Sequence, residues 1–266
     1  MGGSSFEFLL VDAFTDVYCK GNQAAVCFLK EYPGQDLLQA IAKFHNWSEI
    51  SFVKQLDDNE FQMRWFSPND EVPLCGHATL AASFAIFQTK KTTSNDIIIH
   101  YNSGILKATN HNQLITLNFP TKPTYPCNKD SRIIKKALNI EKIINIERDD
   151  LVYVVELQDP KTVKGLDPNL SLISQLDCRA VAVTAKGSNY DFHSRYFAPK
   201  VGINEDPVCG SMHCRLAYYW SRKLNKTQFK AFQESKRTGQ LDVRIVEDSV
   251  YLTGNAVIVA RFKTRY

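Results

Sequence analysis

The amino-acid sequence predicts an α+β fold of two pseudo-symmetric lobes that repeat one design. The first observation is a repeated motif: "RWFSP" (64–68) precedes "EVPLCGH" (71–77), and "RYFAP" (195–199) precedes "EDPVCGS" (205–211). The second observation is that the same order of strand-like and helix-like segments surrounds both copies. The third is a proline-rich stretch at 120–128, which separates the two halves.

The length of 266 residues accommodates two ordinary lobes, each with a core of its own. The proline-rich stretch predicts an N-terminal lobe over residues 1–120 and a C-terminal lobe over residues 121–266. The last strand is free to return to the N-terminal lobe, so its placement stays open at this point.

In the N-terminal lobe, alternating apolar and polar residues predict strands, and helical spacing predicts two helices. The first helix, 34–47, has one apolar face, and the second, 75–88, is small and apolar on all sides. A helix of the second kind is typical of a core in which other elements surround it. The expected strands are 6–14, 22–29, 49–55, 60–67, 96–102, 104–110 and 113–120.

The C-terminal lobe repeats this order. Short helices are expected at 131–140 and 169–176, and a longer, buried helix is expected at 209–224. The expected strands are 151–157, 179–186, 190–199, 229–235, 240–248 and 249–262.

Composition excludes several classes of function. The net charge of +4 comes from 32 basic and 28 acidic residues, and no Lys/Arg run exceeds two, so nucleic acid is not an expected partner. No apolar stretch approaches the ~18 residues that a membrane span needs. Seven cysteines without CxxC pairs predict neither a disulfide framework nor a metal site, and they indicate a reducing, cytoplasmic compartment.

The repeated Cys-Gly turn carries the chemistry, because each copy begins a helix. The first N–H groups of a helix lack intrahelical partners and lie at the positive end of its dipole, so they bind anions. Gly76 and Gly210 let the backbone come close to a ligand. Two such turns facing one interlobe cleft would hold a small carboxylated molecule and stabilise a developing enolate or carbanion.

These residues resemble the PhzF-like (phenazine biosynthesis-like) isomerase/epimerase family, which has the diaminopimelate-epimerase-like fold. The resemblance rests on GN-x-AAV, SE-x-SFV, E-x-P-x-x-GHAT and EDP-x-x-GS in that order, and it extends from residue 11 to 259. It implies two lobes, each a curved, mostly antiparallel sheet wrapped around a central helix. It also implies an active site without a metal or an organic cofactor. A homodimer is expected by analogy alone.

The resemblance also implies roles for particular residues. The glutamate of SE-x-SFV, Glu49, would be the acid/base that removes and returns a proton on a small carboxylated substrate. His77 of GHAT and Asp206 of EDP-x-x-GS would share the catalytic work, and Ser211 would contact the substrate. The reaction would move a double bond or invert a centre.

The local sequence gives Glu49 a chemical setting of its own. The apolar neighbours Trp47, Ile50 and Phe52 predict a raised carboxyl pKa, which would suit a group that accepts and donates protons. The alternatives are an exposed loop carboxylate for Glu49 and a satisfied structural histidine for His77.

Cys75 and Cys209 keep a second function open. Both thiols stand at helix starts, so they are expected to contact the substrate, and in thiol-based epimerases of this fold one cysteine removes the α-proton and another returns it. The PhzF-like pattern usually has threonine at the position of Cys209, so this chain departs from it. A third possibility is a PhzF-like binding protein without catalysis. The twinned Arg64 and Arg195 are expected to brace their own loops.

Overall fold

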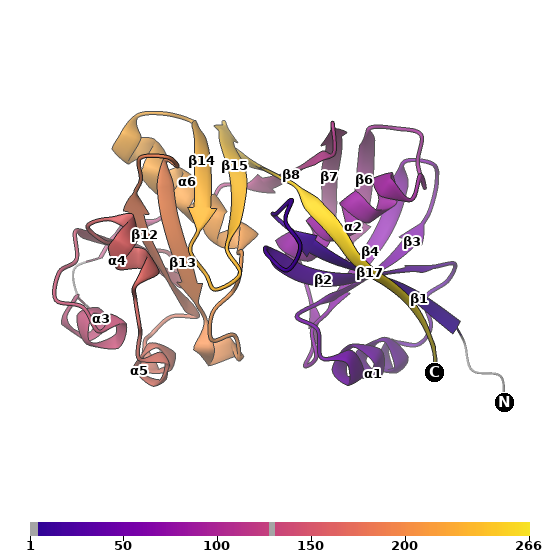
Figure 1. Cartoon of the computed structure of the whole chain (residues 1–266), viewed down its shortest axis with the longest axis horizontal. Coiled ribbons are helices and arrows are strands. Elements are labelled where there is room, and N and C mark those ends of the chain that lie inside the picture. Colours follow the sequence, from indigo (N-terminus) through magenta and orange to yellow (C-terminus); the bar gives the residue numbers. More distant parts are fainter. Residues whose placement is uncertain (1–4, 128–130) are drawn as a thin grey trace. The chain divides into compact units, whose positions relative to one another are not determined.

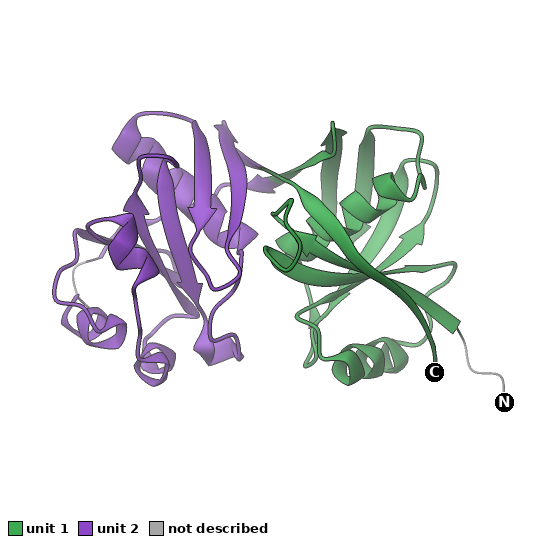
Figure 2. Cartoon of the chain, in the orientation of Figure 1, with its two compact units in different colours: residues 1–118, 253–266 green, residues 119–252 purple. Residues whose placement is uncertain are grey.

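The structure, a computed structural model, describes residues 5–127 and 131–266. Two compact units divide the chain (Figure 2): unit 1 comprises residues 1–118 and 253–266, and unit 2 comprises residues 119–252. The first boundary therefore lies slightly before the expected one, and the last segment belongs to unit 1.

The last strand lies in unit 1 because it completes the sheet there. Strand β17 (Ala256–Arg265) pairs antiparallel with β1 (Ser5–Ala13) along the whole of β1. The rings of Phe262 and Phe8 stack at 5.4 Å between centroids, which adds apolar packing to the backbone ladder. The sequence left this strand's placement open, and strand pairing decides it.

Unit 1 is a mixed sheet with two parallel steps. Antiparallel pairs are β1 with β2 (Asn22–Leu29), β3 (Ile50–Gln55) with β4 (Glu60–Phe66), β4 with the short β5 (Glu71–Val72), β6 (Asp96–Tyr101) with β7 (Gly104–His111), and β7 with β8 (Leu114–Pro120). The pairs β2–β3 and β4–β6 are parallel. A parallel pair needs a crossover, and helices α1 (Gln35–His45) and α2 (Gly76–Gln88) lie in those two connections.

Helix α2 forms the centre of the unit 1 core (Figure 1). It contacts strands β1, β2, β3, β7 and β17, and every residue from His77 to Ile86 is buried. Its small side chains let the strands approach on all sides, so burial is balanced around the helix instead of lying on one stripe. The sequence prediction of a buried helix at this position is confirmed.

Unit 2 is also a mixed sheet. Its strands are β9 (Tyr125–Pro126), β10 (Asn145–Arg148), β11 (Val152–Glu156), β12 (Ala180–Lys186), β13 (Phe192–Phe197), β14 (Gln228–Gln233) and β15 (Gly239–Val246), followed by β16 (Ser249–Gly254). Its helices are α3 (Ser131–Leu138), α4 (Pro160–Lys164), α5 (Leu170–Gln175), the 3₁₀ turn η1 (Pro199–Val201) and α6 (Gly210–Leu224). Helix α6 lies against β15 and is largely buried, as the sequence predicts.

Both units follow one series of strand pairings. From β1 through β2, β3, β4 and β6 to β7, successive pairs are antiparallel, parallel, antiparallel, parallel and antiparallel. The same series connects β10, β11, β12, β13, β14 and β15. The helix in the second parallel connection is α2 in unit 1 and α6 in unit 2, and each begins directly after a cysteine. The repeated motif therefore belongs to a repeated topology.

The repeated Arg and Glu of the motif form the same ion pair in each unit. Arg64 donates from Nε to Oε1 of Glu71 at 2.8 Å and from Nη2 to Oε2 at 2.7 Å. Arg195 donates in the same two-pronged way to Glu205, at 2.7 and 3.0 Å. Each guanidinium also lies over the phenylalanine ring two residues further along. The expectation that each arginine braces its own loop is confirmed.

This brace predicts a stability effect. Arg64→Gln is expected to lower the free energy of unfolding by about 2 kcal/mol, because it leaves a carboxylate in a site of low exposure without its charged partner. The side chains of Arg64 and Glu71 are 16% and 18% exposed. Lys54→Gln is the control, since its partner Glu31 is 80% exposed and such pairs contribute about 0–1 kcal/mol. Urea unfolding measures the free energy of unfolding of both variants. Equal losses would show that the Arg64–Glu71 pair stabilises the protein no more than an exposed ion pair does.

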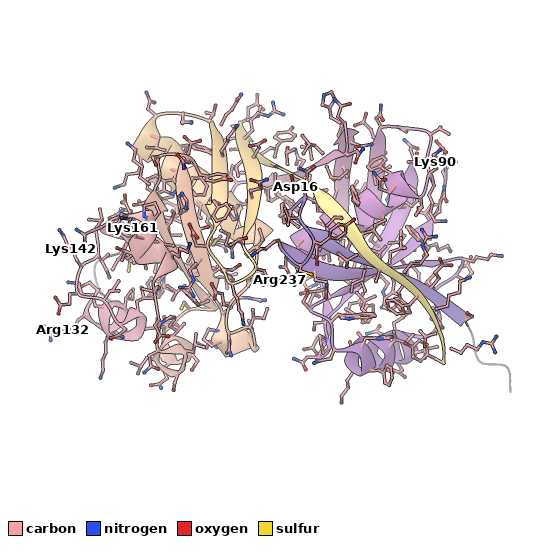
Figure 3. The ribbon with its side chains drawn as sticks, viewed as in Figure 1. Asp16, Lys90, Arg132, Lys142, Lys161 and Arg237 are labelled. Atoms are coloured by element: carbon pink, nitrogen blue, oxygen red, sulfur yellow. The ribbon has the colours of Figure 1, made fainter. Side chains whose placement is uncertain are left out.

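The small positive charge is spread over many elements. Figure 3 labels Arg132 on α3, Lys161 on α4 and Lys90 after α2 as examples. Within the described residues, no helix is both long and apolar enough to cross a membrane.

Candidate active site

Glu49 lies immediately before β3, and the sheet fixes its backbone. The Ala25 N–H donates to the Glu49 carbonyl at 3.0 Å, as the first step of the parallel β2–β3 ladder. The preceding helix α1 ends at Asn46, which takes a left-handed conformation (φ 52°) and turns the chain into the strand. The Glu49 side chain is 12% exposed, so its carboxylate is nearly withdrawn from water.

His77, the second residue of α2, meets that carboxylate. Its Nε2 lies 3.1 Å from Oε2 of Glu49 and 3.3 Å from Oγ of Ser48. The thiol of Cys75 lies 3.4 Å from the other ring nitrogen, Nδ1. The fold therefore brings together three residues that the sequence singled out separately, with Gly76 in the turn between two of them.

The electrostatics of this cluster differ from the sequence expectation. Burial raises the pKa of Glu49, but the charge and hydrogen bond of His77, with further hydrogen bonds from its neighbours, outweigh burial and hold the pKa below its ordinary value. The expected rise from apolar neighbours is therefore wrong, because sequence alone does not show that an imidazole lies at 3.1 Å.

The pKa of His77 moves in the opposite direction. Burial lowers it, but the electrostatic interactions and hydrogen bonds with the Cys75 thiol and the Glu49 carboxylate outweigh burial and place the pKa well above its ordinary value. These opposite shifts both favour the imidazolium of His77 beside the carboxylate of Glu49.

Neither helix-start thiol is activated. Burial, followed by the nearby Glu49 charge, raises the pKa of Cys75. Burial, followed by the charge of Asp206, raises the pKa of Cys209 well above its ordinary value. A thiol nucleophile or base requires a lowered pKa, so both cysteines are protonated in the ordinary pH range.

The remaining sequence candidates form a second group in unit 2. The Cys209 thiol lies 3.4 Å from Oγ of Ser211, and Gly210 begins α6 between them. Gln233 on β14 ties the turn together: its Oε1 accepts from the Cys209 N–H at 2.9 Å and its Nε2 donates to the Asp206 carbonyl at 2.6 Å. Each unit therefore holds its own group of candidates around its own helix start.

The duplication shows how the two groups differ. The position of His77 is taken by Ser211. Ile50 pairs with Phe66 and Val181 pairs with the matching Phe197, so the position of Glu49 is taken by Ala180 in unit 2. The acid–base pair is therefore a property of unit 1. One pair of equivalent positions makes the same hydrogen bond in both units. In unit 1, Thr79 Oγ1 donates to the Cys75 carbonyl at 2.6 Å. In unit 2, Nδ1 of His213, the residue equivalent to Thr79, donates to the Cys209 carbonyl at 2.8 Å.

His213, on helix α6, is fully buried. Within the described part of the chain, its Nε2 has no hydrogen-bonding partner. Burial, opposed by the Cys209 carbonyl, lowers its pKa to about 4, so the ring is neutral at ordinary pH.

Sequence reasoning missed two residues of these groups. Ser48 directly precedes Glu49, so its place in the motif was a signal, and its hydroxyl donates to the Gln23 carbonyl at 2.7 Å beside His77. Gln233 gives no signal in the sequence, because it reaches the Cys209 turn only through the pairing of β13 with β14.

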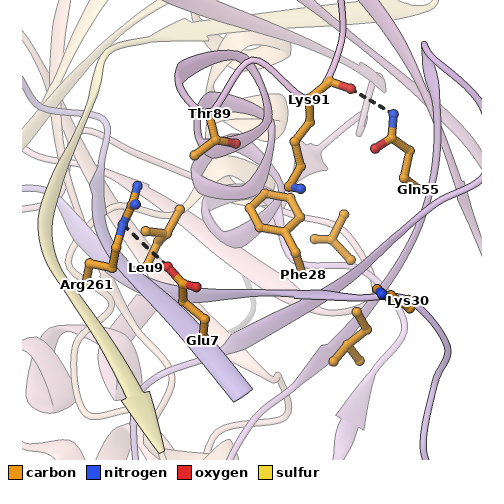
Figure 4. A pocket seen from close by; sticks show the side chains of 10 residues that line it. Glu7, Leu9, Phe28, Lys30, Gln55, Thr89, Lys91 and Arg261 are labelled. Atoms are coloured by element: carbon orange, nitrogen blue, oxygen red, sulfur yellow. Dashed lines mark hydrogen bonds and ion pairs between the residues drawn. The ribbon is translucent and has the colours of Figure 1, made fainter. Parts of the chain in front are cut away.

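A hollow of about 750 Å³ lies elsewhere in unit 1 (Figure 4). Phe28, Leu9 and Lys91 are among the residues that line it, and Lys91 follows the carboxyl end of α2. The 13 residues of α2 span about 20 Å, so the hollow lies away from the helix start. Glu7 in its lining is 3.7 Å from Arg261, an exposed ion pair. The Glu49–His77 cluster is therefore separate from this hollow.

Comparison with known proteins identifies the family. A family described as phenazine biosynthesis-like protein (PhzC-PhzF) matches residues 11–261. The chain belongs to this family. An uncharacterized isomerase of Halalkalibacterium halodurans is 41% identical over 255 residues, which cover 95% of this chain and 96% of that protein. The membership in a PhzF-like isomerase family that the sequence predicts is confirmed.

Solved structures agree with this assignment. A PhzF-family protein of Enterococcus faecalis superposes with a TM-score of 0.92 at 35% identity, covering 99% of this chain and all of that one. A hydroxyproline epimerase of Agrobacterium vitis superposes with a TM-score of 0.63 at 9% identity, covering 98% of this chain and 92% of that one. The second likeness concerns the fold alone, and it places the PhzC-PhzF chain in the same fold group as that epimerase.

Proposed function

We propose that this PhzC-PhzF protein is a cofactor-independent isomerase that moves a proton on a small carboxylated substrate, with Glu49 as the acid/base. The observation that carries the proposal is the buried Glu49–His77 pair, 3.1 Å apart at the start of helix α2. A carboxylate base in low dielectric can remove a proton from carbon, and the adjacent positive charge stabilises the negative charge that develops on the substrate.

The chemistry follows from the protonation states. The Glu49 carboxylate takes a proton from a substrate carbon: the C–H bond breaks, an O–H bond forms, and the electron pair delocalises into the conjugated system of the substrate. The His77 imidazolium and the positive end of α2 stabilise this negative charge. Glu49 then returns the proton to another carbon, and the double bond has moved.

The protonated thiols favour this route over the two-thiol epimerase. A single acid/base serves a double-bond shift, in which the proton leaves and returns on one face of the substrate. Inversion of a centre by two thiols needs one cysteine as a thiolate base and the other as a thiol donor on the opposite face, and with raised pKa values neither cysteine supplies the thiolate. The family resemblance assigns Asp206 and Ser211 to catalysis and substrate contact, and we include both in the proposal as positions whose substitution tests it.

The test is incorporation of solvent deuterium into a panel of small carboxylated compounds, half with a β,γ double bond and half α-amino acids, read by mass spectrometry. We expect wild-type protein to label an unsaturated compound and Glu49→Gln to lose the labelling. Glu60→Gln is the matched control, because Glu60 also contacts a histidine, His100, at 2.8 Å but on an exposed surface. Labelling that survives Glu49→Gln would overturn the proposal, and a wild-type protein that binds panel members without labelling any would favour the non-catalytic alternative.

A further inference from the structure

The Glu49 cluster presents the ligand types of a transition-metal site. One ligand atom each from Glu49, Cys75 and His77 lies within 4.8 Å of the other two. A carboxylate oxygen, a thiolate sulfur and an imidazole nitrogen are the donors that Zn²⁺ takes in proteins. The sequence gave no metal signal because these donors come from two separate segments and lack CxxC spacing.

The donor separations suit tetrahedral coordination. Metal–ligand bonds of about 2.0–2.3 Å at tetrahedral angles place neighbouring ligand atoms about 3.4–3.6 Å apart. Nε2 of His77 lies 3.1 Å from Glu49 Oε2 and 4.0 Å from Cys75 Sγ. Both separations are within about 0.5 Å of that value. The third, between the Glu49 carboxylate and the Cys75 sulfur, is within 4.8 Å, so side-chain rotations can bring these three atoms around one ion.

The open side of the cluster supplies the fourth position. Ser48, whose Oγ is 3.3 Å from the same Nε2, is exposed, whereas Cys75 and His77 are buried. A cation thus reaches the cluster from the Ser48 side and completes its shell with water or that hydroxyl. Three protein ligands with a fourth open position are typical of accessible zinc sites.

We propose that Glu49, Cys75 and His77 bind a borderline divalent cation of the Zn²⁺ type, and that the bound cation inhibits the protein reversibly. The cation occupies the Glu49 carboxylate that moves the proton and the His77 imidazole that stabilises the developing charge, so catalysis and metal binding exclude each other. The inhibition rests on the proposed function, whereas the binding does not.

Cobalt tests the site directly, because a thiolate-to-Co²⁺ charge-transfer band appears only when sulfur is a ligand. We expect protein without an affinity tag to bind one Co²⁺ with this band, and Zn²⁺ to remove it. Cys75→Ser should abolish the band, and Glu49→Gln and His77→Gln should weaken binding by about tenfold or more.

Cys209→Ser is the matched control, because unit 2 has Ser211 and Ala180 at the positions where unit 1 has the other two ligands. We expect it to keep the band. Thermal unfolding without metal checks that each variant is folded. If Cys75→Ser is not folded, the cobalt affinities of Glu49→Gln and His77→Gln test the site instead. No band in wild type, a band that survives in Cys75→Ser, or equal cobalt affinity in all variants would overturn the site.

Solvent-deuterium exchange separates this proposal from the proposed function. If the cobalt band appears but Zn²⁺ does not slow solvent-deuterium exchange, the metal site is supported and the proposed inhibition is overturned. Loss of exchange in Glu49→Gln without any cobalt band in wild type would keep the proposed function and overturn the site.

Discussion

His77→Gln is expected to slow solvent-deuterium exchange by about 10²-fold or more, the usual cost of removing one electrostatic group from a proton-transfer site. Glutamine keeps a hydrogen-bond donor next to Glu49 but carries no charge. The negative charge that develops on the substrate then loses its nearest cation, while the base itself stays in place.

The same change is expected to move the pH profile. In the wild type the His77 charge lowers the pKa of Glu49, so exchange persists below the ordinary glutamate value of 4.5 and falls only when the carboxylate becomes protonated. Without that charge, burial dominates and the Glu49 pKa rises. The acid limb of the exchange rate therefore moves to higher pH, as exchange rates measured across about pH 3 to 9 would show.

His100→Gln is the control for this prediction, because His100 contacts a glutamate at the same range on an exposed surface. It should change neither the rate nor the acid limb. A rate loss in His77→Gln with an unmoved acid limb would show that His77 only supports the fold and does not govern Glu49.

His213→Thr is expected to flatten the acid dependence of stability. The pKa of His213 is about 4 in the folded protein against 6.5 when unperturbed, so the neutral ring favours folding. This contribution is present above pH 6.5 and is lost as the pH falls toward 4. The difference corresponds to about 3 kcal/mol.

We choose threonine because the equivalent residue of unit 1, Thr79, makes the same kind of hydrogen bond to the Cys75 carbonyl. Urea unfolding between about pH 4 and 7 measures the slope of unfolding free energy for both proteins. We expect the wild type to lose about 3 kcal/mol more than the variant across this range. Parallel slopes would mean that His213 is protonated in the folded state or reaches water.

Much of the fold is predictable from the sequence because local pattern and topology agree. The helix starts at Cys75 and Cys209 were visible as a repeated motif, and each does begin a buried helix. The short helix α4 and strand β10 were not predicted. Helix α4 has five residues and strand β10 has four, too few for a period to emerge.

The site was predictable in its members but not in its electrostatics. Glu49 and His77 were each chosen from motifs, yet their 3.1 Å contact depends on how β3 lies against α2. That contact reverses the pKa shift expected for Glu49 from its apolar neighbours. Likewise, the sequence does not show that Nε2 of His213 lacks a hydrogen-bonding partner among the described residues, because this depends on the packing around α6.

The central claim is that Glu49, and not a pair of thiols, moves the proton. The most direct measurement compares the rate of solvent-deuterium exchange into one labelled compound for Glu49→Gln and Cys209→Ser. We predict a loss of about 10³-fold or more for Glu49→Gln and a change of less than about tenfold for Cys209→Ser. Abolished exchange in Cys209→Ser together with near-wild-type exchange in Glu49→Gln would contradict the account and establish the two-thiol mechanism instead.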